Sequence, residues 1–334
     1  MLRLDKGAFA CLRRRQASVR SRAPTSGRRR GGFGLAVTNE PALGATTWLN
    51  GTLGADCVAI ADRGFLLGDG VFDTALALGR TIFAADRHLA RLVAHAAAIG
   101  IRLDPADLVA AWRAVTQAMP QPHAIIRTTL TRGAAGRGLW PGPDCVPTLA
   151  VTAADWDPAL AGAPLRLATS TIRRSERSPL SRLKSLAYLE SVLAAREAAE
   201  SGADDALLLN HAGAVACTTI ANLFTLRGDV LATPPPSAGI MEGTMRATVL
   251  DLARALGLTV REAALANVDL VTADLVFATN SVRILRPVTV LDGAPIATRK
   301  SRSFQALVHA VAGEVRSACG YRLLEQDVFA RLAR

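Results

Sequence analysis

Lys184 is the residue whose type and isolation point most directly to chemistry. Lysine occurs in this chain of 334 residues only at positions 6, 184 and 300, and arginine supplies almost every other positive charge. A primary amine can lose its proton and attack a carbonyl carbon to form a Schiff base, which a guanidinium group cannot do. A surface lysine at the start of a helix is the alternative interpretation, and rarity by itself does not decide between the two.

Short motifs on both sides of Lys184 favour the chemical interpretation. In chain order they are Gly68–Thr74, His88–Leu92, Gly202–Leu209, Asn222–Phe224, Thr233–Pro235 and Gly243–Arg246. Their order over roughly residues 46–318 resembles the class IV (fold type IV) pyridoxal-phosphate enzymes. That family includes branched-chain and D-amino-acid aminotransferases and aminodeoxychorismate lyase. The resemblance therefore implies an enzyme whose cofactor is pyridoxal 5'-phosphate.

The resemblance also implies roles for single residues. Lys184 resembles the lysine that forms a Schiff base with the cofactor and then moves protons. Arg91 resembles the arginine that binds the cofactor phosphate, and a guanidinium group suits this role because it can bind phosphate oxygens bidentately. A solvated helix arginine is the alternative. Backbone N–H groups of one loop and the start of one helix resemble the rest of the phosphate site, at Ile220, Ala221, Asn222, Thr244 and Met245.

Cys217 departs from the family pattern. The family usually places a glutamate, which faces the pyridine nitrogen, two residues after the valine of this strand, whereas this chain reads Val215-Ala216-Cys217. The glutamate keeps the nitrogen protonated and makes the ring a strong electron sink, and a neutral thiol is a poorer partner. Alternatively, Cys217 is a small core residue, as a free cysteine usually is. On either interpretation we expect a weaker electron sink.

Two reactions are open to such an enzyme. The favoured one is the elimination of pyruvate from 4-amino-4-deoxychorismate, which gives 4-aminobenzoate in the folate pathway. Aromatisation of the ring supplies driving force, so this lyase tolerates a weaker sink. The alternative is an aminotransferase for branched-chain or D-amino acids, with 2-oxoglutarate as acceptor. Residues 189–193 and the pair Asn280-Ser281 are similar to the lyase pattern, but Leu76 stands where that pattern has an arginine.

Candidate residues for the substrate are polar or cationic side chains near these motifs. Arginines suit a substrate carboxylate, although surface or interface positions explain them equally well. The candidates are Arg132, Asn280, Ser281 and Arg286, with Arg283 as an alternative to Arg286.

Charge and cysteine content exclude several classes of protein. Residues 1–34 hold ten Lys or Arg and a single acid, so most of the net charge of +11 belongs to this segment. The remainder of the chain lacks the basic footprint of a nucleic-acid-binding protein. The five cysteines are scattered, without C-x-x-C spacing, which predicts free thiols, no metal site and a cytoplasmic enzyme. No apolar run is long enough to cross a membrane.

The elements that must position these residues suggest an α/β (α+β) protein with two domains. We expect a disordered basic extension over 1–40, a small N-terminal α/β domain over 46–152 and a connecting segment over 153–164. A large cofactor-binding domain, mixed and β-barrel-like with surrounding helices, should follow over 165–334. Asp86 is expected to cap a helix that ends near Gly100, and a second helix follows Asp104-Pro105. The family resemblance implies a homodimer with its active site at the domain junction.

Overall fold

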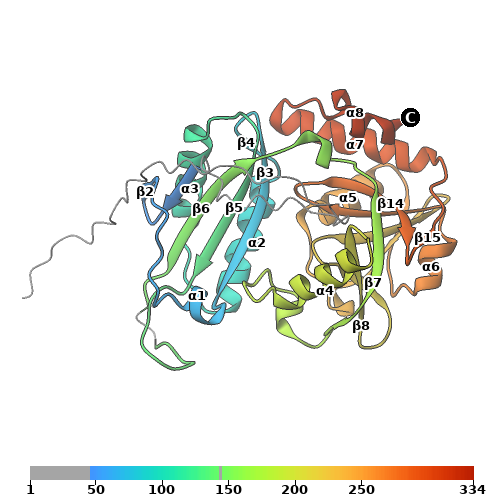
Figure 1. The fold of residues 1–334 in the computed structure, drawn as a ribbon. Coiled ribbons are helices and arrows are strands. Elements are labelled where there is room, and N and C mark those ends of the chain that lie inside the picture. The colour runs from blue at the N-terminus through green and yellow to red at the C-terminus, as the bar shows by residue number, and fades with distance from the viewer. Residues whose placement is uncertain (1–45, 143–144) are drawn as a thin grey trace, which may run out of the picture. The chain divides into compact units, whose positions relative to one another are not determined.

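The computed structural model describes residues 46–142 and 145–334. These residues belong to one compact unit, which holds two β-sheets and the helices packed on them (Figure 1). The predicted disordered extension, residues 1–40, lies outside the described ranges. None of the helices within those ranges is long and apolar enough to cross a membrane.

The first sheet has six strands, and each neighbouring pair in it is antiparallel. Two helices, α2 (Ala85–Ala98) and α3 (Pro105–Ala118), pack against it through a shared apolar core (Figure 1). In spatial order the strands are β2 (Thr52–Leu53), β1 (Thr46–Leu49), β6 (Thr148–Asp155), β5 (Ala124–Thr131), β3 (Gly70–Leu78) and β4 (Thr81–Ile82).

The starts of these two helices show one correct and one wrong prediction. Helix α3 begins as its sequence indicates, because the Asp104 carboxylate accepts the N–H of Ala106 at 2.8 Å and Pro105 occupies the first turn. The prediction that Asp86 caps α2 is wrong. The cap position is Ala84, in a left-handed conformation (φ 52°) without a side-chain hydrogen bond. Asp86 lies in the first turn, where its charge interacts favourably with the helix dipole.

The second sheet has nine strands and is mixed. Strands β11 and β12, β14 and β7, and β7 and β8 pair in parallel, whereas its other pairs are antiparallel. In order the strands are β12 (Thr259–Glu262), β11 (Val230–Thr233), β10 (Asn222–Arg227), β13 (Leu275–Asn280), β14 (Ile284–Leu291), β7 (Leu165–Arg174), β8 (Asp205–Asn210) and β9 (Val215–Thr218), with β15 (Ala294–Pro295) paired to β14.

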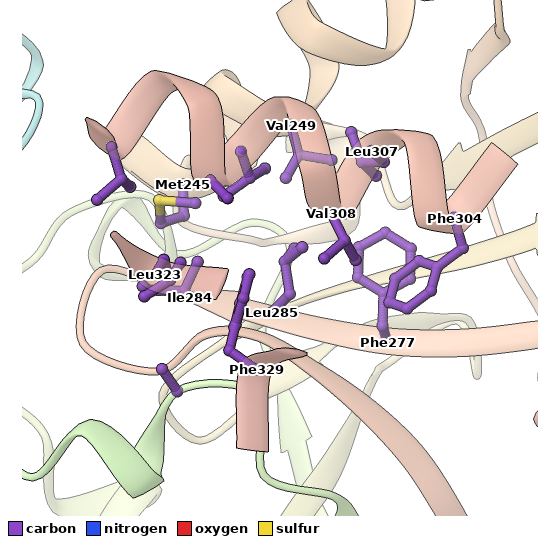
Figure 2. Close-up of a cluster of buried hydrophobic side chains, with 14 of the residues drawn as sticks. Met245, Val249, Phe277, Ile284, Leu285, Phe304, Leu307, Val308, Leu323 and Phe329 are labelled. Atoms are coloured by element: carbon purple, nitrogen blue, oxygen red, sulfur yellow. The ribbon is translucent and has the colours of Figure 1, made fainter. Parts of the chain in front are cut away.

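The main core of the second sheet lies between helix α5 (Thr244–Ala255), helix α7 (Arg302–Cys319) and strands β13 and β14. Figure 2 shows Val249 of α5 and Val308 of α7 close together, with Phe277 of β13 beneath them. Phe277 also stacks on Phe224 of β10, with ring centroids 5.1 Å apart. This packing holds α5 against the sheet and so fixes where the helix begins, which matters for the site described below.

The connection between the two sheets runs from β6 to β7. Strand β6 continues through Asp155, three residues into the segment 153–164 that we expected to be a linker. The division into domains over 46–152 and 165–334 stays a prediction. The remaining helices are α1 (Arg63–Leu67), α4 (Leu189–Glu200), α6 (Asn267–Thr272) and α8 (Asp327–Ala330), with short 3-10 turns at Pro158–Leu160, Pro179–Ser181, Pro236–Ala238, Leu323–Glu325 and Arg331–Ala333.

Candidate active site

A cavity of about 340 Å³ is lined by residues from both sheets. Cavities of this size are typical of small-molecule and cofactor sites. It brings together most of the residues that the sequence singled out, namely Arg91, Lys184, Cys217, Ile220, Ala221, Asn222, Thr244, Met245, Asn280 and Ser281. Arg132 and Arg286 do not line it.

Lys184 is held in place by backbone pairing with the start of β3. The N–H of Phe72 donates to the carbonyl of Lys184 at 2.8 Å, and the N–H of Leu186 donates to the carbonyl of Gly70 at 3.0 Å. A Cβ at position 70 would press against the Leu130 carbonyl and the Leu186 side chain, so only glycine allows this close approach. The motif Gly68–Thr74 therefore positions the lysine.

The amine of Lys184 lies in an apolar and cationic environment. Its Nζ is 4.2 Å from the centroid of the Phe72 ring and 5.5 Å from that of Tyr188. Burial, followed by the charges of Arg91 and Arg127, lowers the pKa of Lys184 to about 8, although Asp73 opposes this effect. With this pKa, roughly a tenth of the amine is neutral at pH 7 and about half at pH 8, and this neutral form can act as nucleophile or base.

His95 on α2 supports the backbone of Lys184. Its Nδ1 accepts the N–H of Lys184 at 3.1 Å. Burial, followed by the charge of Arg91, lowers the pKa of His95 to about 4. The imidazole is therefore neutral near pH 7, as an acceptor nitrogen requires.

Arg91 belongs to a buried charge cluster. Its Nε and Nη2 donate to Asp73 Oδ2 at 2.9 and 2.7 Å, and His88 Nδ1 lies 2.6 Å from Asp73 Oδ1. Burial raises the pKa of Asp73, but His88 and Arg91 outweigh burial and hold that pKa at about 2. The bonds to Asp73 therefore hold the Arg91 side chain in one orientation. In this orientation its Nη1 atom lies 3.7 Å from Met241 Sδ.

The first residue of α5 links this cluster to the second sheet. Thr244 Oγ1 lies 3.4 Å from His88 Nε2 and 2.8 Å from Ser281 Oγ. Helix α5 carries no side-chain hydrogen bond at its cap, Gly243, so its first N–H groups are not capped by a side chain. Such an end attracts anions through its N–H groups and its dipole.

The loop between β9 and β10 differs from the expectation that its N–H groups bind phosphate. The N–H groups of Ile220 and Ala221 donate to Thr218 Oγ1 at 3.3 and 2.9 Å, and Thr219 N–H donates to Asp205. The side chain of Asn222 bonds to the carbonyl of Met241 and to the N–H of Gly243. These residues line the cavity, but their donors satisfy other protein groups.

Cys217 is the third residue of β9 and lines the cavity, although only 9% of its surface is exposed. Burial raises the pKa of its thiol to about 11, so the group is neutral near pH 7. Position 217 therefore offers a weak neutral donor in place of the carboxylate that the family pattern has there.

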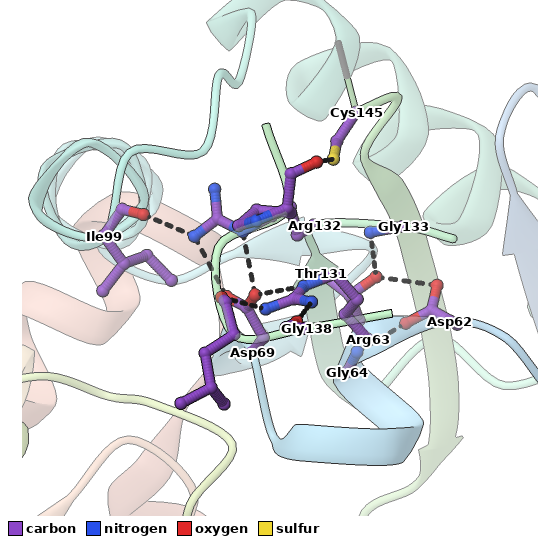
Figure 3. Close-up of polar contacts among 12 residues, drawn as sticks. Asp62, Arg63, Gly64, Asp69, Ile99, Thr131, Arg132, Gly133, Gly138 and Cys145 are labelled. Atoms are coloured by element: carbon purple, nitrogen blue, oxygen red, sulfur yellow. Dashed lines mark hydrogen bonds and ion pairs between the residues drawn. The ribbon is translucent and has the colours of Figure 1, made fainter. Parts of the chain in front are cut away.

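Arg132 and Arg286, which were predicted to bind the substrate, do not line the cavity and bond to other protein groups. Figure 3 shows Arg132 turned toward Asp69 and the carbonyl of Ile99. Its Nε and Nη2 donate to Asp69 at 2.8 and 3.0 Å. Arg286 donates to the carbonyls of Ala163 and Pro164, each at 2.7 Å. Each arginine therefore joins segments of the chain that are far apart in the sequence.

Several residues that line the cavity were not predicted as site residues, among them Phe72, Arg127, Arg174 and Tyr188. Arg127 lies over the Phe72 ring, with its guanidinium carbon 4.0 Å from the centroid. It is the one charged residue of β5, which otherwise reads as apolar residues and threonines. A lone arginine in such a strand is a signal that could have marked this position.

The lining residues fit a phosphorylated aldehyde such as pyridoxal 5'-phosphate. Lys184 supplies a neutral amine for the carbonyl, whereas Arg91 and the start of α5 supply donors for a phosphate group. The hydroxyl of Thr279 is buried and has no hydrogen-bond partner, and Thr279 lines the same cavity. No group of three or more His, Cys, Asp or Glu in the described ranges could hold a metal ion.

Comparisons with known proteins agree with this geometry. The family model "Amino-transferase class IV" matches residues 70–291. The putative branched-chain-amino-acid aminotransferase of Methanocaldococcus jannaschii is 32% identical over 272 residues, which cover 80% of this chain and 94% of that protein. A putative 4-amino-4-deoxychorismate lyase from Legionella pneumophila superposes with a TM-score of 0.74 at 31% identity, over 78% of this chain and 96% of that one.

One solved structure bears on the cofactor. A branched-chain amino acid aminotransferase from T.th., solved in complex with N-(5'-phosphopyridoxyl)-L-glutamate, superposes with a TM-score of 0.73 at 26% identity. The match covers 84% of this chain and 97% of that one. The predictions of a two-domain α+β fold of type IV and of pyridoxal 5'-phosphate as cofactor are thus confirmed. The chain belongs to the class IV aminotransferase family and is a pyridoxal-phosphate-dependent enzyme.

Proposed function

We propose that this enzyme is a 4-amino-4-deoxychorismate lyase, which releases pyruvate and forms 4-aminobenzoate. The observation that carries the proposal is the charge of the cavity. Arg127, Arg174 and Arg283 line it without an ion-pair partner within the described residues, where no Asp or Glu lines the cavity. Arg174 donates to the carbonyls of Gly239 and Ser181, which leaves Arg127 and Arg283. The proposed substrate has two carboxylates, which would balance these two cations.

We assign each residue a role in this reaction from its position in the cavity. Lys184 holds the cofactor and, as a neutral amine, moves the proton at the substrate carbon that bears nitrogen. Arg91 and the start of α5 hold the phosphate, and Asn280 and Ser281 line the same cavity. The bound cofactor supplies an electron sink. The neutral Cys217 thiol favours a reaction that depends less on this sink, and formation of an aromatic ring is such a reaction.

An aminotransferase is the second candidate, and one observation favours it. The relative from Methanocaldococcus jannaschii, matched over 94% of its length, is described as a putative branched-chain-amino-acid aminotransferase. The usual acceptor, 2-oxoglutarate, is also a dicarboxylate, so Arg127 and Arg283 would serve it equally well. For this candidate, L-leucine or D-alanine is the amino donor.

One experiment separates the two reactions. The cofactor-loaded enzyme is mixed with L-leucine or D-alanine without a keto acid, and the cofactor absorbance is followed. In parallel, it is given 4-amino-4-deoxychorismate, and pyruvate and 4-aminobenzoate are measured. Formation of both products without bleaching by either amino acid supports the lyase. Stoichiometric conversion of the cofactor to its pyridoxamine form by an amino acid, without 4-aminobenzoate formation, overturns it in favour of the aminotransferase.

We also propose a homodimer. Large apolar side chains are exposed on α1 and on the neighbouring loop, which Arg63 joins through hydrogen bonds to the carbonyls of Gly138 and Leu139. Large apolar side chains exposed on neighbouring segments are typical of a protein interface. Its members are Phe65, Leu66, Leu67, Leu139 and Trp140, with Phe65 72% and Trp140 85% exposed. Sedimentation should give twice the chain mass, and Phe65→Glu should give the monomer. A monomeric native protein would refute the proposal.

A cytoplasmic location is proposed as well. Cys145, Cys217 and Cys319 are free thiols. Free thiols are typical of a reducing compartment. Cell fractionation tests this, and recovery of the enzyme from an oxidising compartment would contradict it.

A further inference from the structure

Asn222 is buried beside the cavity and bonds twice to the short segment that precedes α5. It begins β10, is 5% exposed, and belongs to the loop that was expected to bind phosphate directly. Its Nδ2 donates to the Met241 carbonyl at 2.9 Å, and its Oδ1 accepts the N–H of Gly243 at 3.1 Å. Because one partner is a carbonyl and the other an N–H, only one orientation of the amide satisfies both.

These two bonds fix the chain just before α5. Gly243 is the cap residue of that helix and Met241 lies two residues earlier. Position 243 must be glycine while Asn222 holds it, because a Cβ there would overlap Asn222 Oδ1. The backbone at Gly243 (φ −72°) is otherwise open to any residue. The close contact, and not the backbone conformation, therefore requires glycine.

The two Asn222 hydrogen bonds, here called the Asn222 clamp, also bear on Arg91, the proposed phosphate arginine. Met241, whose carbonyl Asn222 binds, places its Sδ 3.7 Å from Arg91 Nη1. The opposite edge of Arg91 is held by Asp73. Met241 thus contacts Arg91 of α2 on one side and lies just before α5 in the chain. Because Asn222 holds Met241 in place, it fixes the position of Arg91 relative to the start of α5.

We propose that Asn222 is a positioning residue for the phosphate group of the cofactor. It acts without touching the phosphate, by fixing segment 241–243 so that the start of α5 and Arg91 face one bound anion together. This inference rests on the assignment of the cavity as the cofactor site and holds for the lyase and for the aminotransferase alike. Its test is therefore independent of which reaction the enzyme performs.

The test compares pyridoxal 5'-phosphate with pyridoxal, which lacks the phosphate. Both carry the aldehyde that reacts with Lys184, so the ratio of their dissociation constants isolates the phosphate end. Asn222→Ala removes two buried hydrogen bonds and should weaken binding of the phosphorylated form about ten-fold or more. Binding of pyridoxal should change less than about two-fold. Equal weakening of both, or of neither, would overturn the proposal.

Asn210→Ala is the matched control. Asn210 is an asparagine buried to a similar degree, 4% exposed, and it bonds to the Ala238 carbonyl and the Ala214 N–H in the same manner. It does not line the cavity. This variant should lose stability in the cofactor-free protein while leaving the ratio of the two dissociation constants unchanged. A change in that ratio as large as for Asn222→Ala would count against a role specific to Asn222.

A double-mutant cycle gives a second and independent test. Gly243→Ala in the native protein should weaken binding of the phosphorylated form, because the new Cβ displaces Asn222 Oδ1. In the Asn222→Ala background the contact with Oδ1 is gone, the Arg246 Cβ at 3.7 Å is an ordinary van der Waals contact, and the same substitution should cost much less. If Gly243→Ala weakens binding of the phosphorylated form equally in both backgrounds, Asn222 does not hold Gly243 and the proposal is overturned. The single variant Gly243→Ala keeps the proposal testable where Asn222→Ala fails to fold.

Discussion

Arg91 directs both Nε and Nη2 to the same oxygen of Asp73, at 2.9 and 2.7 Å, inside the protein. The side chains are only 9% and 2% exposed. The pair is therefore shielded from water, and the carboxylate decides which edge of the guanidinium group faces the cavity. Arg91, which we propose binds the cofactor phosphate, is therefore oriented before any anion arrives.

The first prediction concerns the stability that this pair provides. Asp73→Asn leaves Arg91 as an uncompensated buried charge and should lower the free energy of unfolding by about 3 kcal/mol or more. Asp251→Asn is the control, because its pair with Arg87 is exposed (54% and 43%) and should contribute less than about 1 kcal/mol. Urea denaturation of the cofactor-free protein measures both. Similar losses for the two variants would contradict the prediction.

The same carboxylate gives an acid dependence of stability. The pKa of Asp73 is lowered from 3.8 to about 2 in the folded protein. Its stabilising contribution is therefore present above pH 3.8 and is lost as the pH falls toward 2. In Asp73→Asn, the part of the acid unfolding profile below about pH 4 should be flatter than in the native protein. An unchanged profile would show that Asp73 does not contribute to acid sensitivity.

The second prediction concerns the reactivity of Lys184. Only the neutral amine attacks an aldehyde, so the rate at which cofactor-free protein reacts with pyridoxal should rise with pH through a midpoint near 8. Arg127→Gln removes one of the charges that lower this pKa and should shift the midpoint upward. Stopped-flow absorbance gives both profiles. A midpoint near the ordinary lysine value of 10.5 in the native protein would disprove the prediction.

The third prediction tests the identity of the essential amine. Lys184→Ala should abolish turnover, and Lys184→Arg should do the same because a guanidinium group stays protonated. Lys300→Ala is the control, since Lys300 is exposed and remote in sequence from the motifs. Turnover is assayed with 4-amino-4-deoxychorismate and with amino acids. Retention of native turnover by Lys184→Ala would refute the assignment of this enzyme.

The fourth prediction concerns Cys217. Cys217→Glu places an acidic group where this chain has a neutral thiol, and it should raise the rate of the amine-transfer half-reaction with L-leucine about ten-fold, ~1.4 kcal/mol in the barrier. Cys217→Ser is the control, because it preserves size and neutrality. Single-turnover absorbance follows the half-reaction. If Glu and Ser at this position give the same rate as the native protein, the electron-sink argument is wrong.

The fifth prediction separates two arginines that lie five residues apart. Arg127→Met should raise KM for the dicarboxylate substrate by about ten-fold or more, because it removes a cation of the cavity wall. Arg132→Met should leave KM nearly unchanged and lower stability, because Arg132 pairs with Asp69. Kinetics and thermal unfolding of both variants decide this. A KM effect from Arg132→Met that matches that of Arg127→Met would contradict the geometry.

Much of the candidate site was predictable because it depends on residue type and short spacing. Lys184 stands out as a lone amine, and the motifs near it mark Arg91 and the start of α5 as candidate phosphate donors, which the structure places in the same cavity. The start of α3 was equally predictable, because a cap of the form Asp104-Pro105 acts within one turn. These features need only neighbours along the chain.

Other features depend on partners distant in sequence, and the tertiary structure alone decided them. Arg127 lies within β5 and faces the cavity, whereas Arg132 comes after the last residue of that strand and pairs with Asp69. Ile220 and Ala221 were expected to offer N–H groups to phosphate, but Thr218 Oγ1 competes for them. Asn222 meets Met241 and Gly243 across the fold, some twenty residues later in the chain. The sequence by itself thus determined the family and the candidate chemical groups, because these depend on residue type and short spacing, whereas long-range packing decided which of those groups face the cavity.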